Sequence, residues 1–438
     1  MSASLIDKLS RGRRHLREGV ATLNGVLTTR LRRHKIYDPI GAKRLTLVHF
    51  GDYAEGYWRL ASGGPETYYA QKYTVEFVES LVTSKAAESV TSVSLSANLD
   101  ATVLPNGVNT LGVELYPKGE IARHSQLVEA VRRTNPTHLV VMSVSLPLIS
   151  WGIRAHIPML PMLADSFRDT GPKAKFKYKL LTLLLNSPSI ELVANHNLAA
   201  SLDLKRIGVD PRKIVPFDWP ALISPRSYDA KKAPPADRTF RLLYVGSLVE
   251  SKGVGDAILA LSKLLKRGRN IQLTIIGHGD LERFKGIAAA ECVQKHVSFL
   301  GPRGHGEVLS AMRDHDAVLV PSRWAYPEGL PMTLYEALCV RTPLITSDHP
   351  MFALKIRNLH NALVFPERNT DAFAECIDKL ISSPQLYESL SQTAENAAKG
   401  YLCPLKYDQL ISGFLDPTER RKLRNFSLSA YDYGAEPR

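Results

Sequence analysis

Two series of short apolar segments, each alternating with helix-like periods, run through the chain and constrain its fold more than any other feature. The first series occupies residues 45–217 and the second occupies residues 241–399. Short apolar runs between amphipathic helices predict parallel sheets that helices cover on both faces. We therefore expect an α/β protein with two doubly wound, Rossmann-like domains that face each other across a cleft.

The break between the two series predicts the domain boundaries. Residues 218–238 contain four prolines and scattered charges, a composition typical of a linker. We expect a basic amphipathic arm, a first domain, a linker, a second domain, and a C-terminal helix that crosses back to the first domain and ends in a tail. These five parts are assigned to residues 1–43, 44–220, 221–238, 239–400 and 401–438.

Within the first domain, the pattern is less regular near its start. A buried strand at 45–50 is followed by a loop rich in Gly and Tyr, and a helix is expected at 66–84. Residues 143–157 are assigned no element. Sheet edges in such domains bind ligands beyond the carboxyl ends of the strands, so the turns there are the positions to search for functional residues.

Composition limits the class of protein. Hydrophobic residues make up 44% and charged residues 23% of the 438 positions, which is ordinary for a globular chain. The four cysteines lie far apart without a Cys-x-x-Cys pair, which excludes a zinc ribbon and a disulfide scaffold. No apolar run is long enough for a membrane-spanning helix, and the start lacks the pattern of a secretory signal. We expect a cytoplasmic, reducing location.

The net charge of +13 is concentrated at one end of the chain. Residues 1–44 hold eleven Lys and Arg against three Asp and Glu, a balance of +8. Leucines recur there at helical spacing over residues 4–35, so this stretch is expected to be either a helix packed on the protein or an anchor on anionic lipid at the inner face of the cell membrane. No aromatic residues alternate with the arginines and no nucleic-acid motif is present, so nucleic acid is not an expected partner.

The stretch from Val320 to Pro343 is the most informative for chemistry. A buried strand ends at Pro321, a loop contains Glu328, and a helix that carries Glu336 begins near residue 332. The free N–H groups and the dipole at a helix start favour an anion such as a phosphate. Glu336 could accept hydrogen bonds from ribose hydroxyls, and Glu328 could do the same for a hexose. The alternative is that Glu336 is a surface residue of the helix and Glu328 is a helix cap.

Three further strand ends in the second domain have turns suited to a nucleotide. The first combines Gly246, which permits close backbone approach, with Lys252 near the start of the next helix. The second ends at Gly277 and could border a nucleoside. The third contains Gly301 and Arg303, which could lie at the edge of a nucleotide base. The Asp-x-Asp pattern at 314–316 lies at a helix-to-strand join, where a structural turn is expected rather than a metal site.

These motifs together resemble the C-terminal domain of the family 4 (group 1) glycosyltransferases. The matching stretches are "VGSLVESKG" at 245–253, "FLG" at 299–301, "DAVLVPS" at 316–322 and "EGLPMTLYEAL" at 328–338. The resemblance implies a GT-B fold and transfer of a sugar, with retention, from a nucleotide-diphosphate donor to a saccharide or lipid-linked saccharide acceptor. It implies no cofactor and no metal. A nucleotide-sugar epimerase of similar fold and a non-catalytic sugar-nucleotide-binding protein stay open as alternatives.

The resemblance also assigns roles to particular residues. Glu328, Lys252 and Asp165 are the expected catalytic residues. The "SGGPET" stretch at 62–67 resembles the family's Gly-Gly-x-Glu turn, which approaches the donor phosphate or the acceptor. The expected donor-binding residues are Gly63, Gly64, Gly246, Ser247, Lys252, Gly277, Gly301, Arg303, Glu328, Gly329, Leu330, Pro331, Met332, Thr333 and Glu336.

The chain departs from the family pattern at two points. Ser247 stands where the family has its first diphosphate-binding arginine, so Lys252 is left to neutralise the diphosphate unless Arg323, Lys355 or Arg357 replaces that arginine. The first domain lacks the family's histidine at the end of a strand near 139–147. Asp165 and Ser166 are therefore the candidates for contact with the acceptor.

Overall fold

The computed structural model describes residues 41–67, 69–115, 121–329 and 331–433. The predicted arm at 1–43, apart from its last three residues, lies outside the described residues, and so does Leu330 of the predicted donor loop. The chain divides into two compact units. Unit 1 contains the described residues up to Arg59, then Lys72–Phe217 and Leu405–Tyr433, whereas unit 2 contains Leu60–Gln71 and Asp218–Pro404.

Unit 1 is built on an eight-stranded sheet in the order β3-β4-β2-β1-β5-β6-β7-β8. Its strands are β1 (Arg44–His49), β2 (Ser89–Ser94), β3 (Leu99–Val103), β4 (Asn109–Gly112), β5 (His138–Val141), β6 (Met159–Leu163), β7 (Val193–His196) and β8 (Ile214–Phe217). All neighbouring strands pair in parallel except β3 and β4, which are antiparallel. The central strands β5 and β6 are buried along their whole length, which explains their continuous apolar sequences.

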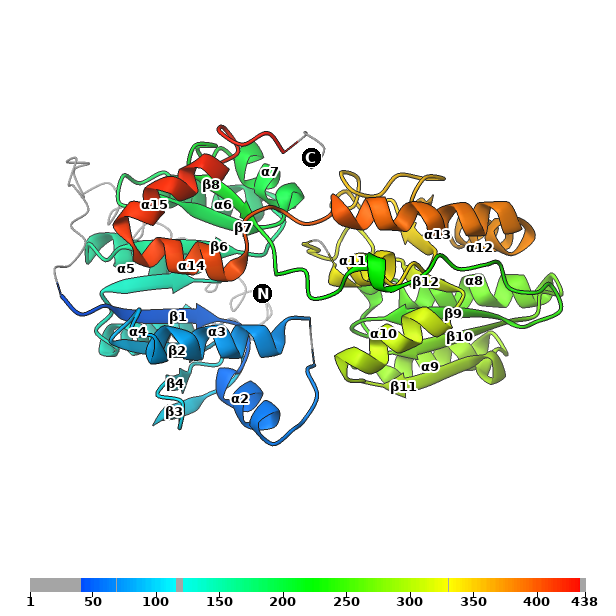
Figure 1. Ribbon diagram of the computed structural model, residues 1–438, viewed down its shortest axis with the longest axis horizontal. Helices are drawn as coiled ribbons and strands as arrows, with labels where there is room; N and C mark the ends of the chain where they lie inside the picture. Colours follow the sequence, from blue (N-terminus) through cyan, green and yellow to red (C-terminus); the bar gives the residue numbers. More distant parts are fainter. Residues whose placement is uncertain (1–40, 68, 116–120, 330, 434–438) are drawn as a thin grey trace, which may run out of the picture. The chain divides into compact units, whose positions relative to one another are not determined.

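Helices pack against this sheet and close the core of unit 1. They are α2 (Tyr53–Ala61, whose last two residues group with unit 2), α3 (Gln71–Thr83), α4 (Ile121–Arg133), α5 (Leu146–Arg154), α6 (Pro172–Leu185), α7 (Leu198–Arg206), α14 (Tyr407–Leu415) and α15 (Pro417–Leu423). Figure 1 shows α14 and α15 within this unit, although they follow unit 2 in sequence. The ring of Phe414 on α14 meets that of His138 edge-on, at 5.8 Å between centroids.

The end of the chain is more structured than the predicted tail. A 3₁₀ turn at Arg424–Phe426 follows α15, and the N–H of Leu428 donates to the carbonyl of Ile214 on β8 at 2.9 Å. Arg420 of α15 is buried, and its guanidinium donates to the carbonyl of Phe414 at 2.7 Å. The expectation of a tail directly after the crossing helix was therefore wrong for residues 417–428, because these contacts hold the segment to unit 1.

Unit 2 contains a six-stranded parallel sheet in the order β11-β10-β9-β12-β13-β14. Its strands are β9 (Phe240–Val245), β10 (Ile271–Ile276), β11 (Val297–Gly301), β12 (Ala317–Val320), β13 (Leu344–Ser347) and β14 (Leu363–Phe365). Its helices are α8 (Val254–Lys266), α9 (Leu281–Ala290), α10 (His305–Asp314), α11 (Met332–Cys339), α12 (Thr370–Ser382) and α13 (Pro384–Lys399), with 3₁₀ turns at Pro225–Ser227, Glu250–Lys252 and Gln294–His296. The strand order reverses beside β9, where ligands bind in sheets of this type.

Four elements of unit 1 differ from the sequence-based expectation. The loop after β1 contains α2, which Asp52 caps by accepting the N–H of Glu55 at 3.0 Å. The helix expected at 66–84 begins only at Gln71, because the Gln71 side chain accepts the N–H of Thr67 at 2.9 Å and holds a turn before it. The unassigned stretch after β5 forms α5, capped by Ser145. The antiparallel edge strand β3 was also not predicted.

Two further features of the described chain concern its helices and its cysteines. No helix among the described residues is both long and apolar enough to cross a membrane. The four cysteines are all free thiols, and burial raises the pKa of Cys339 and Cys376 to about 11. Such thiols are poor nucleophiles, so these two cysteines act as small packing residues.

Candidate functional site

The loop between β12 and α11 places two buried carboxylates at the edge of the unit 2 sheet. β12 ends at Val320, and α11 begins at Met332 directly after Pro331, whose backbone is extended. Glu328 lies in the loop and Glu336 in the second turn of α11, and each is 5% exposed. Carboxylates are seldom buried unless they are paired, so both require compensating donors.

Lys252 and Ser322 compensate Glu328. Lys252 Nζ lies 2.5 Å from Glu328 Oε1, and Ser322 Oγ donates to the same oxygen at 2.6 Å. The ammonium also lies over the ring of Tyr326, 4.2 Å from its centroid, which adds a cation–π contact. The predicted catalytic pair is therefore brought together from two strand ends, the turn after β9 and the loop after β12.

His305 holds Glu336 and joins it to the segment 60–71. His305 Nε2 lies 2.8 Å from Glu336 Oε1, and Nδ1 lies 3.5 Å from Glu66 Oε2. The hydrogen bond with Glu336 raises the pKa of His305 above its usual value, because a neighbouring carboxylate favours the charged imidazole. Tyr69 packs edge-on against the His305 ring at 5.5 Å between centroids.

The segment 60–71, which contains Gly63 and Gly64, groups with unit 2 rather than with residues 44–220. The N–H of His305 donates to the carbonyl of Glu66 at 3.2 Å, and the hydroxyl of Tyr69 donates to the carbonyl of Pro220 at 2.7 Å. The Gly-Gly turn therefore lies on a segment that is fixed to α10, the helix whose first residue is His305. Gly63 has φ of +79°, which favours glycine at this turn.

Glycine is required at two of the predicted turns for reasons of space. At Gly277, φ is +148° and an added Cβ would lie 1.8 Å from the carbonyl oxygen of Gly246. At Gly253, which directly precedes α8 and has φ of +72°, an added Cβ would lie 2.1 Å from the carbonyl oxygen of Pro321. The turns after β9, β10 and β12 thus approach each other closely through their backbones. This proximity brings Gly246, Ser247 and Lys252 to one edge of the sheet.

Two of the three candidates to replace the arginine absent at position 247, Arg323 and Lys355, are held by other partners. Arg323 is bound by Asp256 through two hydrogen bonds of 2.8 and 2.9 Å and by Glu250 at 2.5 Å, and the bond to Asp256 raises its pKa further. Lys355 donates to the carbonyl of Gly400 at 2.5 Å. Lys252, by contrast, is ion-paired with Glu328 itself.

The remaining donor-site predictions lie at the same sheet edge with fewer contacts. Gly301 ends β11 with φ of +71°, and Arg303 is exposed, 3.9 Å from Glu307. Gly329 and Thr333 flank Pro331 and Met332 at the start of α11 and are partly exposed. The N–H groups of Met332 and Thr333 are among those that a helix start leaves for an anion, whereas Pro331 has no N–H.

Asp165, the third predicted catalytic residue, belongs to unit 1 and lies just beyond the end of β6. Burial raises the pKa of its carboxyl, and the charge of Lys177 on α6 opposes that rise. Asn195 Nδ2 donates to the main-chain carbonyl of Asp165 at 3.1 Å. Near the ends of β5 and β7, the strands on either side of β6, three buried polar atoms have no hydrogen-bond partner among the described residues, namely Ser143 Oγ, Asn195 Oδ1 and Asn197 Nδ2.

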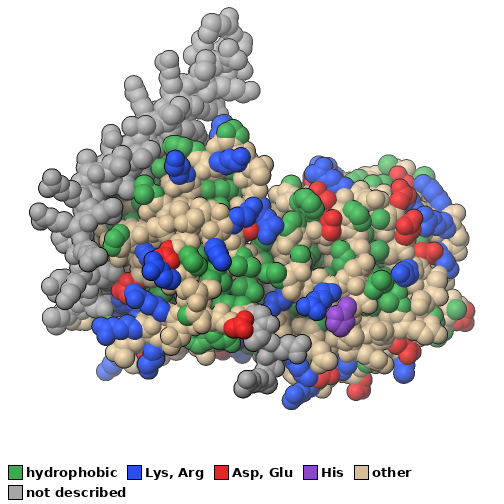
Figure 2. Space-filling view, turned by 90° about the horizontal axis from the view of Figure 1, so that it is seen from above, with side chains coloured by type: hydrophobic (Ala, Val, Ile, Leu, Met, Phe, Trp, Pro, Cys, Tyr) green, Lys and Arg blue, Asp and Glu red, His purple; other side chains and the backbone are tan. Residues whose placement is uncertain are grey.

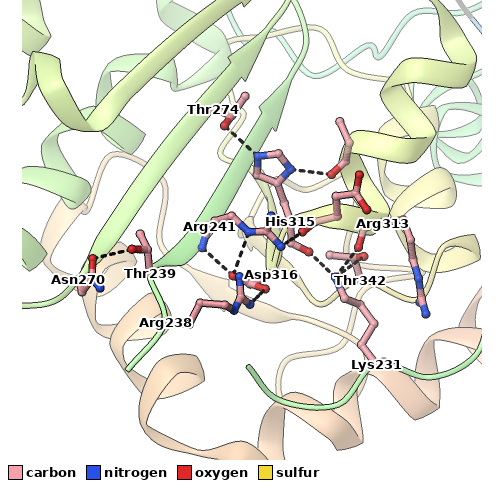
Figure 3. A network of polar contacts seen from close by, with 12 residues as sticks. Lys231, Arg238, Thr239, Arg241, Asn270, Thr274, Arg313, His315, Asp316 and Thr342 are labelled. Atoms are coloured by element: carbon pink, nitrogen blue, oxygen red, sulfur yellow. Dashed lines mark hydrogen bonds and ion pairs between the residues drawn. The ribbon is translucent and has the colours of Figure 1, made fainter. Parts of the chain in front are cut away.

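The Asp-x-Asp sequence at 314–316 forms part of a structural network (Figure 3). Asp316 is ion-paired with Arg238 and accepts the N–H of Arg241 at 2.7 Å. His315 joins α10 to β10 by contacts with the carbonyl of Ala311 at 2.7 Å and with Thr274 at 2.8 Å. Among the residues that the structure describes, no group of three or more His, Cys, Asp and Glu is arranged to hold a metal ion.

Three residues of this site were not named from the sequence. Glu66 and Ser322 lie within the stretches that carried the resemblance, and His305 follows the third glycine turn by four residues. A histidine at the start of a helix that borders a nucleotide turn was the available signal. Its pairing with Glu336 depends on how α10 and α11 pack, which a residue pattern does not contain.

Comparison with known sequences identifies the domain that carries these residues. Residues 226–397 match the family of Glycosyl transferases group 1. This stretch contains Lys252, His305, Glu328 and Glu336. Residues 226–397 are thus similar to the group 1 glycosyl transferases.

Two relatives of the group 1 domain illustrate its range. The chain is 28% identical over 194 residues to the amylovoran biosynthesis glycosyltransferase AmsK of Erwinia amylovora, covering 43% of this chain and 44% of that protein. It is 32% identical over 161 residues to the alpha-D-kanosaminyltransferase of Streptomyces kanamyceticus, covering 36% of this chain and 39% of that protein. The aligned region thus spans less than half the length of either relative.

Solved structures extend the likeness to most of the chain. Sucrose-phosphate synthase from Thermosynechococcus elongatus superposes with a TM-score of 0.62 at 15% identity, covering 82% of this chain and 95% of that one. Anabaena Alr3699/HepE superposes with a TM-score of 0.60 at 12% identity, covering 87% and 99%. Identities this low establish the fold alone. The chain has the GT-B fold, as the resemblance implied.

Proposed function

We propose that this chain transfers a sugar from a nucleotide-diphosphate donor to an acceptor hydroxyl, with retention of anomeric configuration, in the assembly of a cell-surface polysaccharide or glycolipid. The observation that carries the proposal is the ion pair of Lys252 with Glu328, in the loop before α11, within the stretch that matches the group 1 glycosyl transferases. The solved structure of HepE is a complex with UDP and glucose, which supports a nucleotide-sugar donor.

The donor would be held through its diphosphate. As the anomeric bond breaks, negative charge grows on the leaving diphosphate, and Lys252 and the N–H groups at Met332 and Thr333 would stabilise it. Glu328 would accept hydrogen bonds from the hexose and Glu336 from the ribose. The charge of Lys252 is already 2.5 Å from Glu328, so one cation can contact both the sugar-binding carboxylate and the phosphate.

The transfer step requires no protein nucleophile in this proposal. The acceptor hydroxyl attacks the anomeric carbon from the face of the leaving group, the bond to the diphosphate oxygen breaks, and a phosphate oxygen takes the hydroxyl proton. Exclusion of water from the site would limit hydrolysis of the donor. No metal or other cofactor is needed to balance this step.

The acceptor would bind at the carboxyl edge of the unit 1 sheet. Asp165 and Asn195 Oδ1 would accept hydrogen bonds from sugar hydroxyls. Ser143 Oγ and Asn197 Nδ2 would donate hydrogen bonds to them. Buried polar atoms without partners are costly unless a ligand or water satisfies them. A saccharide, free or linked to lipid, has the hydroxyl density that such an edge would bind.

A donor screen followed by product analysis tests the proposal. Thermal shift with uridine, guanosine and adenosine diphosphates identifies the base, and incubation of the matching sugar donors with candidate acceptors follows. The proposal predicts a glycoside with the same anomeric configuration as the donor, read by NMR. An inverted product would contradict retention, an isomerised donor formed without acceptor would favour an epimerase, and binding without transfer would favour a non-catalytic protein.

A further inference from the structure

His305 has no role in the proposed reaction, yet both nitrogens of its ring face carboxylates. Nε2 lies 2.8 Å from Glu336 Oε1, and Nδ1 lies 3.5 Å from Glu66 Oε2. An ionised carboxylate accepts hydrogen bonds and cannot donate them, so each contact needs an N–H on the ring. A neutral imidazole carries one N–H, whereas the imidazolium carries two. The two contacts together therefore require the charged form of His305.

The surroundings of His305 favour this charged form. The hydrogen bond with Glu336 raises its pKa, and the charge of Glu66 acts in the same direction. The titratable groups that face the ring from the elements packed against it are Glu336 on α11, and Glu66 and Tyr69 on the segment 60–71. Glu307, on the same helix, accepts the N–H of Gly304 instead. On the face of unit 2 seen in Figure 2, acidic side chains lie among lysines and arginines, whereas the two carboxylates around His305 have the imidazolium between them.

Glu336 is held at one carboxylate oxygen and keeps the other for a ligand. Its side chain is 7% exposed, and Oε1 accepts the hydrogen bond from His305. Among the described residues, none donates a hydrogen bond to Oε2. A buried carboxylate oxygen without a donor is costly unless a ligand or water supplies one. His305 thus fixes the rotation of this carboxylate and leaves Oε2 to a hydroxyl group.

The segment 60–71 packs closely on the start of α10 and holds the ring of His305 in place. An added Cβ at Gly304, the residue before α10, would lie 2.8 Å from Cβ of Pro65, so glycine there permits the close approach. The ring of Tyr69 meets that of His305 edge-on, at 5.5 Å between centroids. The ring is therefore fixed by packing as well as by its two carboxylate partners, which is what a positioning residue requires.

We propose that His305 is a positioning residue that makes the nucleotide site selective for ribose, because it holds Oε1 of Glu336 and directs Oε2 to the ribose hydroxyls. The inference rests on the proposed function, which assigns the ribose to Glu336. A site built to accept hydrogen bonds from hydroxyls rejects the analogue without them, since the buried oxygen is then left without a donor. When His305 loses a proton, Glu336 and Glu66 compete for the one N–H that remains. The preference for ribose should therefore weaken as pH rises through the pKa of His305.

Isothermal titration of the full chain with paired nucleoside diphosphates tests the proposal. Uridine, guanosine and adenosine diphosphates identify the base, and the one that binds is compared with its 2′,3′-dideoxy analogue from below pH 6.5, the usual pKa of histidine, to well above it. The ratio of the two affinities cancels the titration of the phosphates, which both ligands share. His305→Leu removes both N–H groups, and His305→Gln keeps an amide donor that does not titrate. His360→Leu, at an exposed histidine of unit 2, is the matched control.

Below the pKa of His305, the wild type should bind the ribonucleotide about tenfold or more tightly than the dideoxy analogue, and this ratio should fall as pH rises. The preference should disappear in His305→Leu, become independent of pH in His305→Gln, and stay unchanged in His360→Leu. If His305→Leu is not folded by circular dichroism, the pH profiles of the wild type and His305→Gln decide the question.

Two results would overturn the proposal, because a merely structural histidine would give either of them. One is a preference for ribose that survives in His305→Leu, and the other is a wild-type preference that does not change with pH. Failure of the wild type to bind any of the three diphosphates would overturn the proposed function and this inference with it. Binding with an unaltered ratio in the His305 variants would overturn the inference alone.

Discussion

Removal of the Lys252 ammonium should destabilise unit 2 more than removal of any exposed lysine. Lys252→Met leaves the Glu328 carboxylate, whose side chain is 6% exposed, with the Ser322 hydroxyl as its remaining partner. Breaking a buried ion pair from one side costs about 3–5 kcal/mol. The Lys252 side chain is 16% exposed and Ser322 keeps one hydrogen bond, so about 2–3 kcal/mol is expected here.

A double-mutant cycle separates this effect from loss of packing. Glu328→Gln in the Lys252→Met background replaces the unpaired carboxylate by a neutral amide, so the double variant should be more stable than Lys252→Met alone. Lys285→Met is the matched control, because its ion pair with Glu282 is exposed and contributes about 0–1 kcal/mol. Urea unfolding followed by circular dichroism gives the free energies. A loss of unfolding free energy in Lys252→Met no larger than that in Lys285→Met would contradict this prediction, as would a double variant no more stable than Lys252→Met.

Three further predictions follow from individual contacts. Glu336 raises the pKa of His305, so this pair contributes fully to the free energy of unfolding below the usual pKa of 6.5, and the contribution is lost as pH rises through the raised pKa. The melting temperature of His305→Gln should therefore lack the decline that the wild type shows over this pH range. An identical pH profile for the two proteins would contradict the pairing. Gly277→Ala should cost about 3 kcal/mol or more in urea unfolding, because the methyl carbon meets a carbonyl oxygen, and a neutral result would refute this geometry. Asp316→Asn should lower stability by breaking the Arg238 pair while leaving nucleotide binding unchanged; a selective loss of manganese-dependent activity would contradict the structural role.

The fold was predictable because its signal is repeated along the chain. Strands such as β5 and β12 are buried throughout and read as continuous apolar runs between helices. Elements with one local determinant were missed. The helix α2 depends on a cap by Asp52, and the late start of α3 depends on the side chain of Gln71 bonding back to Thr67.

The site was predictable where one segment carries several residues. Glu328 and Glu336 lie in one loop and in the helix after it, and Lys252 lies in the turn after β9. Because ligand-binding turns follow the carboxyl ends of parallel strands, these three residues were expected at one edge of the sheet. His305 was missed because its partners come from α11 and from the segment 60–71, which are far from it in sequence. The grouping of that segment with unit 2 also depends on tertiary contacts, such as the hydroxyl of Tyr69 with Pro220.

Isothermal titration with a matched nucleoside and nucleoside diphosphate tests the account most directly. We predict that the diphosphate binds the wild type at least about tenfold more tightly than the nucleoside, since charge-assisted hydrogen bonds to phosphate contribute about 1.5–3 kcal/mol. This preference should collapse in Lys252→Ala and persist in Lys285→Ala. Equal affinity for the two ligands in the wild type, or a preference that survives Lys252→Ala, would contradict the claim that Lys252 and the start of α11 grip a diphosphate.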